Sequence, residues 1–141
     1  MPLPQMLQDA IKHPSMYFLP VEFDAAASFL CGFDLGNNGL ALVGFHEWLV
    51  TRFGRANNLA WPPLVLHLAF PDAASPRDCL RDAAGQQLAI DTLFRLLAEF
   101  WHEREAHEGL RRIYLKYEQW LRRQTWYGPS SPHYFDKGKD G

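Results

Sequence analysis

Apolar side chains recur at helical spacing along this chain, and proline and glycine separate the runs. Residues 4–12 place four apolar side chains on one side, and Pro14 ends the run because its ring disfavours helical angles in the preceding residue. A second run covers residues 24–36, with Asp24 as a start signal and residues 36–39 (Gly-Asn-Asn-Gly) as a stop. The pattern predicts two helices before residue 40.

The middle of the chain contains one clear helix and one ambiguous segment. Residues 41–53 carry aromatic and aliphatic side chains on one face, and Gly54 stands where a left-handed cap residue is expected. Residues 61–71 form an apolar run bounded by prolines, which fits either a short strand at about residues 64–70 or a two-turn helix with Pro62 or Pro63 in its first turn. We favour the helix.

The longest amphipathic run follows a helix-start signal. Ser75 is expected to cap a helix whose first turn holds Pro76, and the run continues to about Glu105, with Gly85 as a place where it could divide in two. Its apolar stripe consists of Ile90, Leu93, Phe94, Leu97 and Trp101, widened by Leu96 and Phe100. We expect this helix to supply much of the core.

The last predicted helix covers residues 109–124 and is strongly amphipathic. Its expected inward residues are Leu110, Ile113, Tyr114, Tyr117, Trp120 and Leu121, and its expected outward residues are Arg111, Arg112, Lys116, Arg122 and Arg123. Residues 128–141 are rich in Pro, Ser, Gly and Lys, which is typical of a flexible tail. The sequence therefore predicts a mostly α protein, a single compact domain of about five to six helices over residues 1–127.

Composition narrows the range of functions. The 141 residues carry a net charge of −2, with acidic residues in excess before residue 100 and basic residues in excess after it, which argues against a nucleic-acid partner. The chain begins without a signal-peptide pattern and has no apolar run long enough to span a bilayer. We expect a cytoplasmic protein with no membrane partner and no cofactor. The composition does not predict its oligomeric state.

Candidate chemical motifs have simpler structural interpretations. His102 and His107 are five residues apart, which places their rings about 140° apart on a helix rather than on one metal-binding face. His46 and Glu47 are adjacent, so an ideal helix directs them roughly 100° apart, and a structural or interface role is favoured over acid–base catalysis. Cys31 falls on an apolar helix face and is expected to be buried and inert. We predict no catalytic and no metal site.

Acidic residues supply the candidate partner surface. Asp72, Asp78 and Asp82 cluster around one loop and the following helix start, and Glu47 is added from the aromatic helix before them. Such a cluster is typical of a solvated surface with favourable helix-start electrostatics, but acidic patches also steer basic partner proteins into specific complexes. We assign these four residues as candidate partner-binding residues.

The order of several short motifs resembles a known family. Residues 13–18 (His-Pro-Ser-Met-Tyr-Phe) are similar to an Arg-Pro-x-Met-Tyr-Leu opening, and residues 29–33 (Phe-Leu-Cys-Gly-Phe) to an aromatic-Leu-x-Gly-aromatic helix. Residues 45–54 resemble an aromatic helix that ends in Arg-aromatic-Gly. The last two motifs of the family also follow in the same order: they correspond to a Trp-initiated apolar segment at 61–64 and a Phe-rich helix at 93–100. The chain thereby resembles small bacterial immunity proteins encoded beside polymorphic and contact-dependent toxins, over about residues 5–101.

The resemblance implies an immunity protein, or antitoxin, that acts in interbacterial competition. Such a protein binds a cognate toxin, which is expected to be the product of an adjacent gene, and occludes its active site without catalysis. His13 departs from the family pattern, which has arginine there, and the basic helix at 109–124 lies outside the matched region. The matched positions are mostly core residues, so the resemblance assigns no binding residue. The alternatives are a helical adaptor that does not inhibit its partner and then a small hydrolase.

Overall fold

The computed structural model describes residues 3–131 and shows an all-helical domain. Its α-helices are α1 (Gln5–Lys12), α2 (Phe23–Gly36), α3 (Phe45–Phe53), α4 (Trp61–Ala69), α5 (Ala83–Arg104) and α6 (Gly109–Arg122). Two 3-10 helices, η1 (Pro14–Met16) and η2 (Pro76–Arg81), connect them, and the described residues contain no strand. This confirms the mostly α prediction.

The predicted tail at 128–141 lies largely outside the described residues. None of the helices in the described part has the length and apolar character needed to cross a membrane.

Glycine sets both ends of α3. Gly54 has a left-handed φ of 83°, as predicted for a helix cap, and its N–H donates to the Val50 carbonyl at 2.7 Å. Gly44 also has a left-handed φ, 89°, so the helix begins at Phe45 rather than at the predicted residue 41. Residues 41–44 form a turn that leads into α3.

The ambiguous apolar segment is helical. It forms α4, with Pro62 and Pro63 in the first turn, where a backbone N–H has no intrahelical partner. The possible strand near residues 64–70 is therefore wrong, and the favoured helix is correct. Leu64, Val65 and Leu66 are all buried, which explains why periodicity alone did not distinguish the two structures.

The run predicted as one helix from Ser75 onward divides at Asp82. Ser75 makes no side-chain cap hydrogen bond, and the residues after it form η2. Asp82 is the cap of α5, since its Oδ1 accepts from the Gly85 N–H at 2.6 Å. Gly85 does not itself divide the helix; it lets the two segments approach, because a Cβ there would lie 1.6 Å from the Cys79 carbonyl oxygen.

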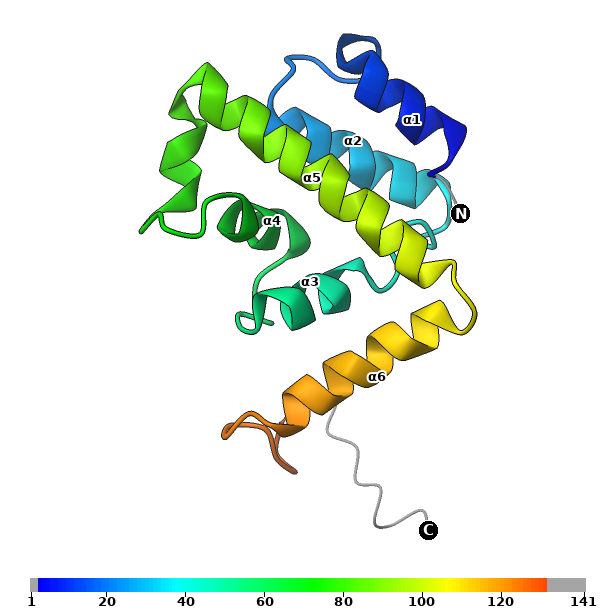
Figure 1. Ribbon diagram of the computed structural model, residues 1–141, viewed down its shortest axis with the longest axis vertical. Helices are drawn as coiled ribbons and strands as arrows, with labels where there is room; N and C mark the ends of the chain where they lie inside the picture. Colours follow the sequence, from blue (N-terminus) through cyan, green and yellow to red (C-terminus); the bar gives the residue numbers. More distant parts are fainter. Residues whose placement is uncertain (1–2, 132–141) are drawn as a thin grey trace.

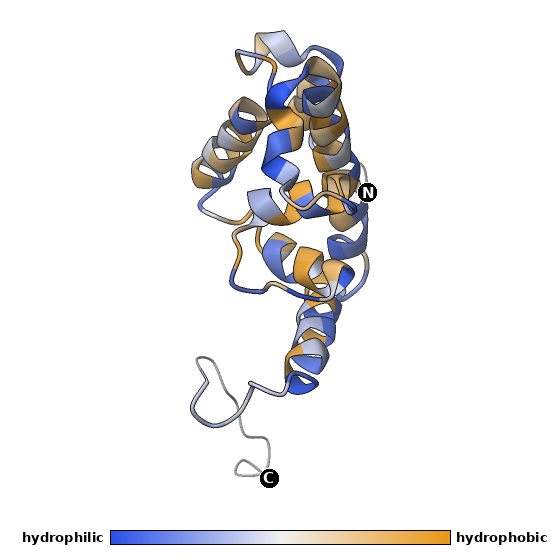
Figure 2. Cartoon of the chain, turned by 90° about the vertical axis from the view of Figure 1, so that its left-hand side faces the viewer, coloured by the Kyte–Doolittle hydropathy of each residue, from blue (hydrophilic) through white to orange (hydrophobic). Residues whose placement is uncertain are grey.

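Helix α5 runs through the middle of the molecule (Figure 1). It packs against α2, α4 and η2, and α3 packs against α4 and α6. The predicted stripe is confirmed, since Ile90, Leu93, Phe94, Leu96, Leu97 and Phe100 are all buried, while Trp101 is half-buried. Figure 2 shows hydrophilic and hydrophobic positions alternating along the helices, and each of the helices α1 to α6 contributes buried apolar side chains to this core.

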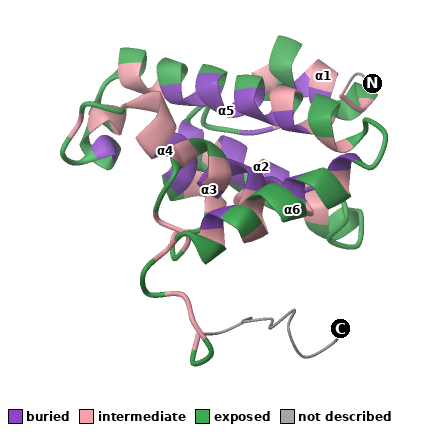
Figure 3. Ribbon diagram, turned by 60° about the horizontal axis from the view of Figure 1, so that its bottom comes forward, coloured by how far each residue is buried: buried purple, intermediate pink, exposed green. Residues whose placement is uncertain are grey.

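Helix α6 lies at one edge of the molecule and is more exposed than the sequence predicted. Ile113 and Trp120 are buried, whereas Tyr114 was expected inward and is 40% exposed. Much of the α6 surface is solvent-accessible (Figure 3). The reason is that α6 has α3 as its main packing partner, so only a narrow stripe of the helix is covered.

Candidate binding groove between α3, α5 and α6

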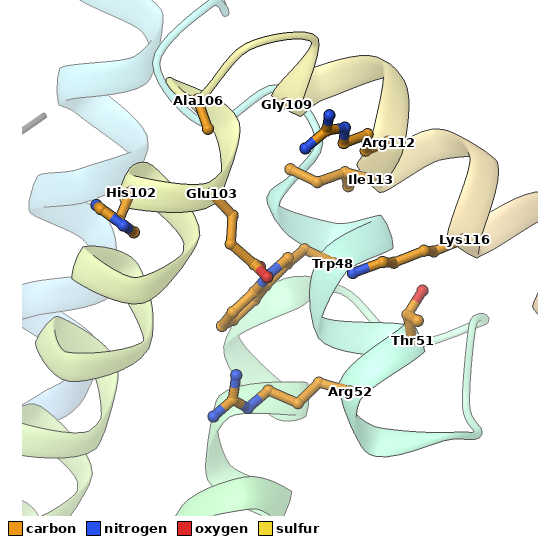
Figure 4. Close-up of a pocket in the computed structure, with 10 residues that line it drawn as sticks. All are labelled: Trp48, Thr51, Arg52, His102, Glu103, Ala106, Gly109, Arg112, Ile113 and Lys116. Atoms are coloured by element: carbon orange, nitrogen blue, oxygen red, sulfur yellow. The ribbon is translucent and has the colours of Figure 1, made fainter.

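A groove with a volume of about 420 Å³ lies where the end of α5 and the beginning of α6 meet α3 (Figure 4). Helix α3 contributes aromatic and polar side chains to it, α5 contributes an acidic one, and α6 contributes cations. The lining residues are Trp48, Thr51, Arg52, His102, Glu103, Ala106, Gly109, Arg112, Ile113 and Lys116. The groove therefore combines segments that are about sixty residues apart in the chain.

A tight turn at residues 105–108 creates the groove. Glu108 has a positive φ of 53°, and a Cβ on Gly109 would lie 2.1 Å from the Glu103 carbonyl oxygen. Glycine at position 109 therefore lets α6 start directly against the end of α5. Gly44, the residue before α3, also allows a close approach, because a Cβ there would lie 2.8 Å from the Leu110 side chain on α6. These glycines hold α6 close enough to α3 for both helices to line the groove.

The floor of the groove is a network of side chains that satisfy one another. Trp48 is 7% exposed, and its indole N–H donates to the Glu103 carboxylate. The Arg52 guanidinium lies 4.9 Å from the Trp48 ring centroid and forms an ion pair of 2.6 Å with Glu99. Arg52 and Glu103 are thus committed to contacts within the protein, and they hold the Trp48 ring in place.

The rim carries two cations that have no acidic partner. Arg112 and Lys116 are exposed, lie one turn apart on α6, and extend toward the groove in Figure 4. Among residues 3–131, no carboxylate forms an ion pair with either of them. Other arginines of the same helix are paired: Arg111 with Glu108 at 3.5 Å and Arg122 with Glu118 at 3.1 Å. The groove therefore has a positively charged rim above an aromatic floor.

The acidic residues predicted from sequence lie elsewhere. Asp72, Asp78 and Asp82 are exposed in the segment between α4 and α5, at the start of α5, whereas the groove is at its end. A helix of 22 residues is about 33 Å long, so this acidic segment and the groove are well separated. Glu47 is on α3 and is not among the residues that line the groove. The structure thus brings the three aspartates together along one segment and leaves Glu47 apart from them.

Basic residues are interleaved with those aspartates. Asp78 pairs with Arg81 at 3.2 Å, and the neighbouring Arg77 pairs with Asp24 at 2.7 Å. Asp24, expected as a helix-start signal, thus forms an ion pair, and no side chain caps the start of α2. These contacts offset much of the negative charge of the segment.

His46 and Glu47 interact, which their positions on an ideal helix did not predict. The His46 Nε2–H donates to the Leu59 carbonyl at 2.9 Å, and Nδ1 lies 3.8 Å from a Glu47 oxygen. The Glu47 carboxylate raises the pKa of His46 although burial opposes this. For Glu47, burial by itself would raise the pKa, but the hydrogen bond and charge of His46 together with a backbone hydrogen bond outweigh it and lower the pKa. The hydrogen bond between His46 and Leu59 ties α3 to the loop that precedes α4.

The remaining candidates for chemistry are not assembled into a site. His102 lines the groove and His107 lies in the turn after α5; no group of three or more His, Cys, Asp or Glu side chains in residues 3–131 could hold a metal ion. The prediction for Cys31 is wrong, since its side chain is exposed on the outer surface of α2. Cys79 is half-buried beneath the start of α5.

Compared with protein-family models, with curated proteins and with solved structures, the chain matches none of them. The groove therefore has to be interpreted from its own residues. Sequence reasoning correctly placed Arg112 and Lys116 on the outward face of the last helix but did not identify the groove. The feature of the sequence that could have indicated a binding surface there was the spacing of Arg112 and Lys116, two like charges four residues apart on one helix.

Proposed function

We propose that this protein acts by binding another protein through the groove between α3, α5 and α6. The observation that carries the proposal is the combination of the fixed Trp48 floor with the unpaired Arg112 and Lys116 on its rim. Tryptophan and arginine are the residue types most enriched at the energetic centres of protein interfaces. An interface of ordinary size covers about 800 Å² on each partner, so the exposed face of α6 would extend the contact beyond the groove.

We further propose that the partner is a cognate interbacterial toxin and that the protein is an immunity protein acting in the cytoplasm of the producing cell. The order of motifs over about residues 5–101 supports this identity. In this account the chain occludes the active site of the toxin and performs no chemistry itself. The basic helix α6, which lies outside the resembling region, would then give the partner specificity of this particular chain.

A non-inhibitory adaptor is the second candidate, and one observation favours it. Met16 and Leu19, 77% and 74% exposed, lie in the connection between α1 and α2, far along the chain from the groove residues of α6. Exposed apolar side chains mark a contact surface where they form a contiguous patch, and Met16 and Leu19 are the candidates for such a patch here. A protein with two such surfaces could hold two partners together without blocking either.

Co-expression separates these functions. The tagged chain would be co-purified with the product of the adjacent upstream gene, and growth of cells producing that product would be measured with and without the chain. A complex together with restored growth would support immunity, whereas a complex without restored growth would favour the adaptor. Absence of both would overturn the toxin-binding proposal.

A further inference from the structure

We infer that the groove recognises a carboxylate-bearing segment of the partner protein, with Arg112 and Lys116 contacting the carboxylates. This inference rests on the proposed protein-binding function and specifies its chemistry. It also reverses the expectation from sequence, in which the acidic residues of this chain contact a basic partner.

The charges within the groove are only partly neutralised. Arg52 is balanced by Glu99, and the carboxylate of Glu103 accepts from the Trp48 indole. Arg112 and Lys116 remain, so the lining keeps a positive excess even when Glu103 is counted. A carboxylate entering the groove would meet both cations while its neighbouring atoms contacted the side chains of Trp48 and Ile113.

The position of the two cations on α6 strengthens this inference. Like charges four residues apart on one helix repel each other, and this repulsion destabilises the helix. Arg111 and Arg122 on the same helix are each paired with a glutamate three or four residues earlier, and Glu108, which could have paired with Arg112, contacts Arg111 instead. An acidic group from another molecule would relieve the repulsion between Arg112 and Lys116.

The groove favours an acidic protein segment over a nucleic acid. Glu103 lies inside the groove and Glu99 lies directly beside Arg52, so a continuous phosphate backbone would meet two carboxylates as well as the cations. The chain as a whole has a net charge of −2, which opposes the long-range attraction that nucleic-acid binding requires. A peptide segment can place one or two discrete carboxylates at the rim and avoid Glu103.

Two matched double variants test the inference in the full-length protein. R112Q/K116Q removes the two rim cations, and R111Q/R123Q removes two cations that do not line the groove, one on the same helix and one at its C-terminal cap. We expect R112Q/K116Q to raise the Kd for the upstream-gene product about tenfold or more and R111Q/R123Q to change it less than about threefold. Binding of the wild type should also weaken with added salt, because exposed charges are screened. Far-UV circular dichroism and thermal unfolding of each variant would establish that both remain folded.

A direct titration makes the inference independent of the partner's identity. Hexaglutamate peptide and a six-nucleotide single-stranded DNA would each be added to ¹⁵N-labelled full-length protein, with the Trp48 indole resonance assigned by W48F. We expect the peptide to shift the Trp48 signal in the wild type and in R111Q/R123Q but not in R112Q/K116Q.

The outcomes separate this inference from the proposed function. If the wild type binds the upstream-gene product and both double variants bind equally well, the groove assignment is overturned and protein binding stands. If the wild type does not bind that product, the toxin proposal fails, while a peptide-induced shift of Trp48 that depends on Arg112 and Lys116 still supports the groove. A stronger response to DNA than to peptide, or no response to either, would overturn the carboxylate specificity.

Discussion

At the scale of single residues, the acidic side chains predicted from sequence have structural roles that can be measured. Asp82 caps α5 through the Gly85 N–H, whereas Ser75, the cap expected from sequence, makes no such bond. We predict that Asp82→Ala lowers the free energy of unfolding by about 1 kcal/mol and that Ser75→Ala changes it by less than about 0.5 kcal/mol. Urea denaturation of both variants would check this. Equal effects of the two substitutions would contradict the assigned start of α5.

The contact between His46 and Glu47 predicts a pH dependence of stability. Because the carboxylate raises the pKa of His46 in the folded state, the protonated ring stabilises the fold fully below the unfolded pKa of about 6.5. This contribution is lost as the pH rises through the folded pKa. The free energy of unfolding should therefore fall as the pH rises above about 6.5.

Urea denaturation between about pH 5 and 9 measures this effect. His46→Gln should flatten the pH profile in this range, whereas His107→Gln, at an exposed position in the turn after α5, should leave it unchanged. Parallel profiles for the wild type and His46→Gln would show that the pair does not stabilise the folded protein. Nuclear magnetic resonance titration of the His46 ring would report its pKa directly.

At the scale of elements, the docking of α6 depends on a few apolar side chains. Ile113 is 4% exposed between α6 and α3, and its neighbour Leu115 is 41% exposed on the same helix. We predict that Ile113→Ala lowers the free energy of unfolding by about 2–5 kcal/mol, because it leaves a cavity under α6. Leu115→Ala should change it by less than about 0.5 kcal/mol. Chemical denaturation compares the two, and a small effect at Ile113 would mean that α6 is not packed as described.

Most helices were predictable because local residues determine their ends. Pro14 ends α1 and Gly54 caps α3 through backbone preferences that do not depend on the rest of the fold. The break at Asp82 was missed because Ser75-Pro76 is an equally good start for a 3-10 helix, and the break itself depends on the approach of Gly85 to the Cys79 carbonyl. The exposure of Tyr114 was missed for a similar reason, since it depends on how little of α6 is covered.

At the scale of the whole molecule, the groove follows from the way three helices meet. Trp48 and Lys116 are far apart in the sequence, and they line the same groove because the turn at Gly109 brings α6 against α3. The sequence shows the spacing of Arg112 and Lys116 but not the presence or absence of a nearby carboxylate. For this reason the acidic residues near Asp78 were the more evident candidates from sequence, although the fold pairs Asp78 with Arg81 and places Arg77 beside it in an ion pair with Asp24.

Hydrogen–deuterium exchange of the chain alone and in complex with the upstream-gene product would show which surface is covered on binding. If the groove binds the partner, exchange will decrease in α3 and in the first half of α6, where Trp48 and Arg112 lie, and will change little in residues 71–82. Reduced exchange confined to residues 71–82, with α3 and α6 unaffected, would contradict the assignment of the groove as the binding surface. It would indicate instead that the acidic segment binds the partner.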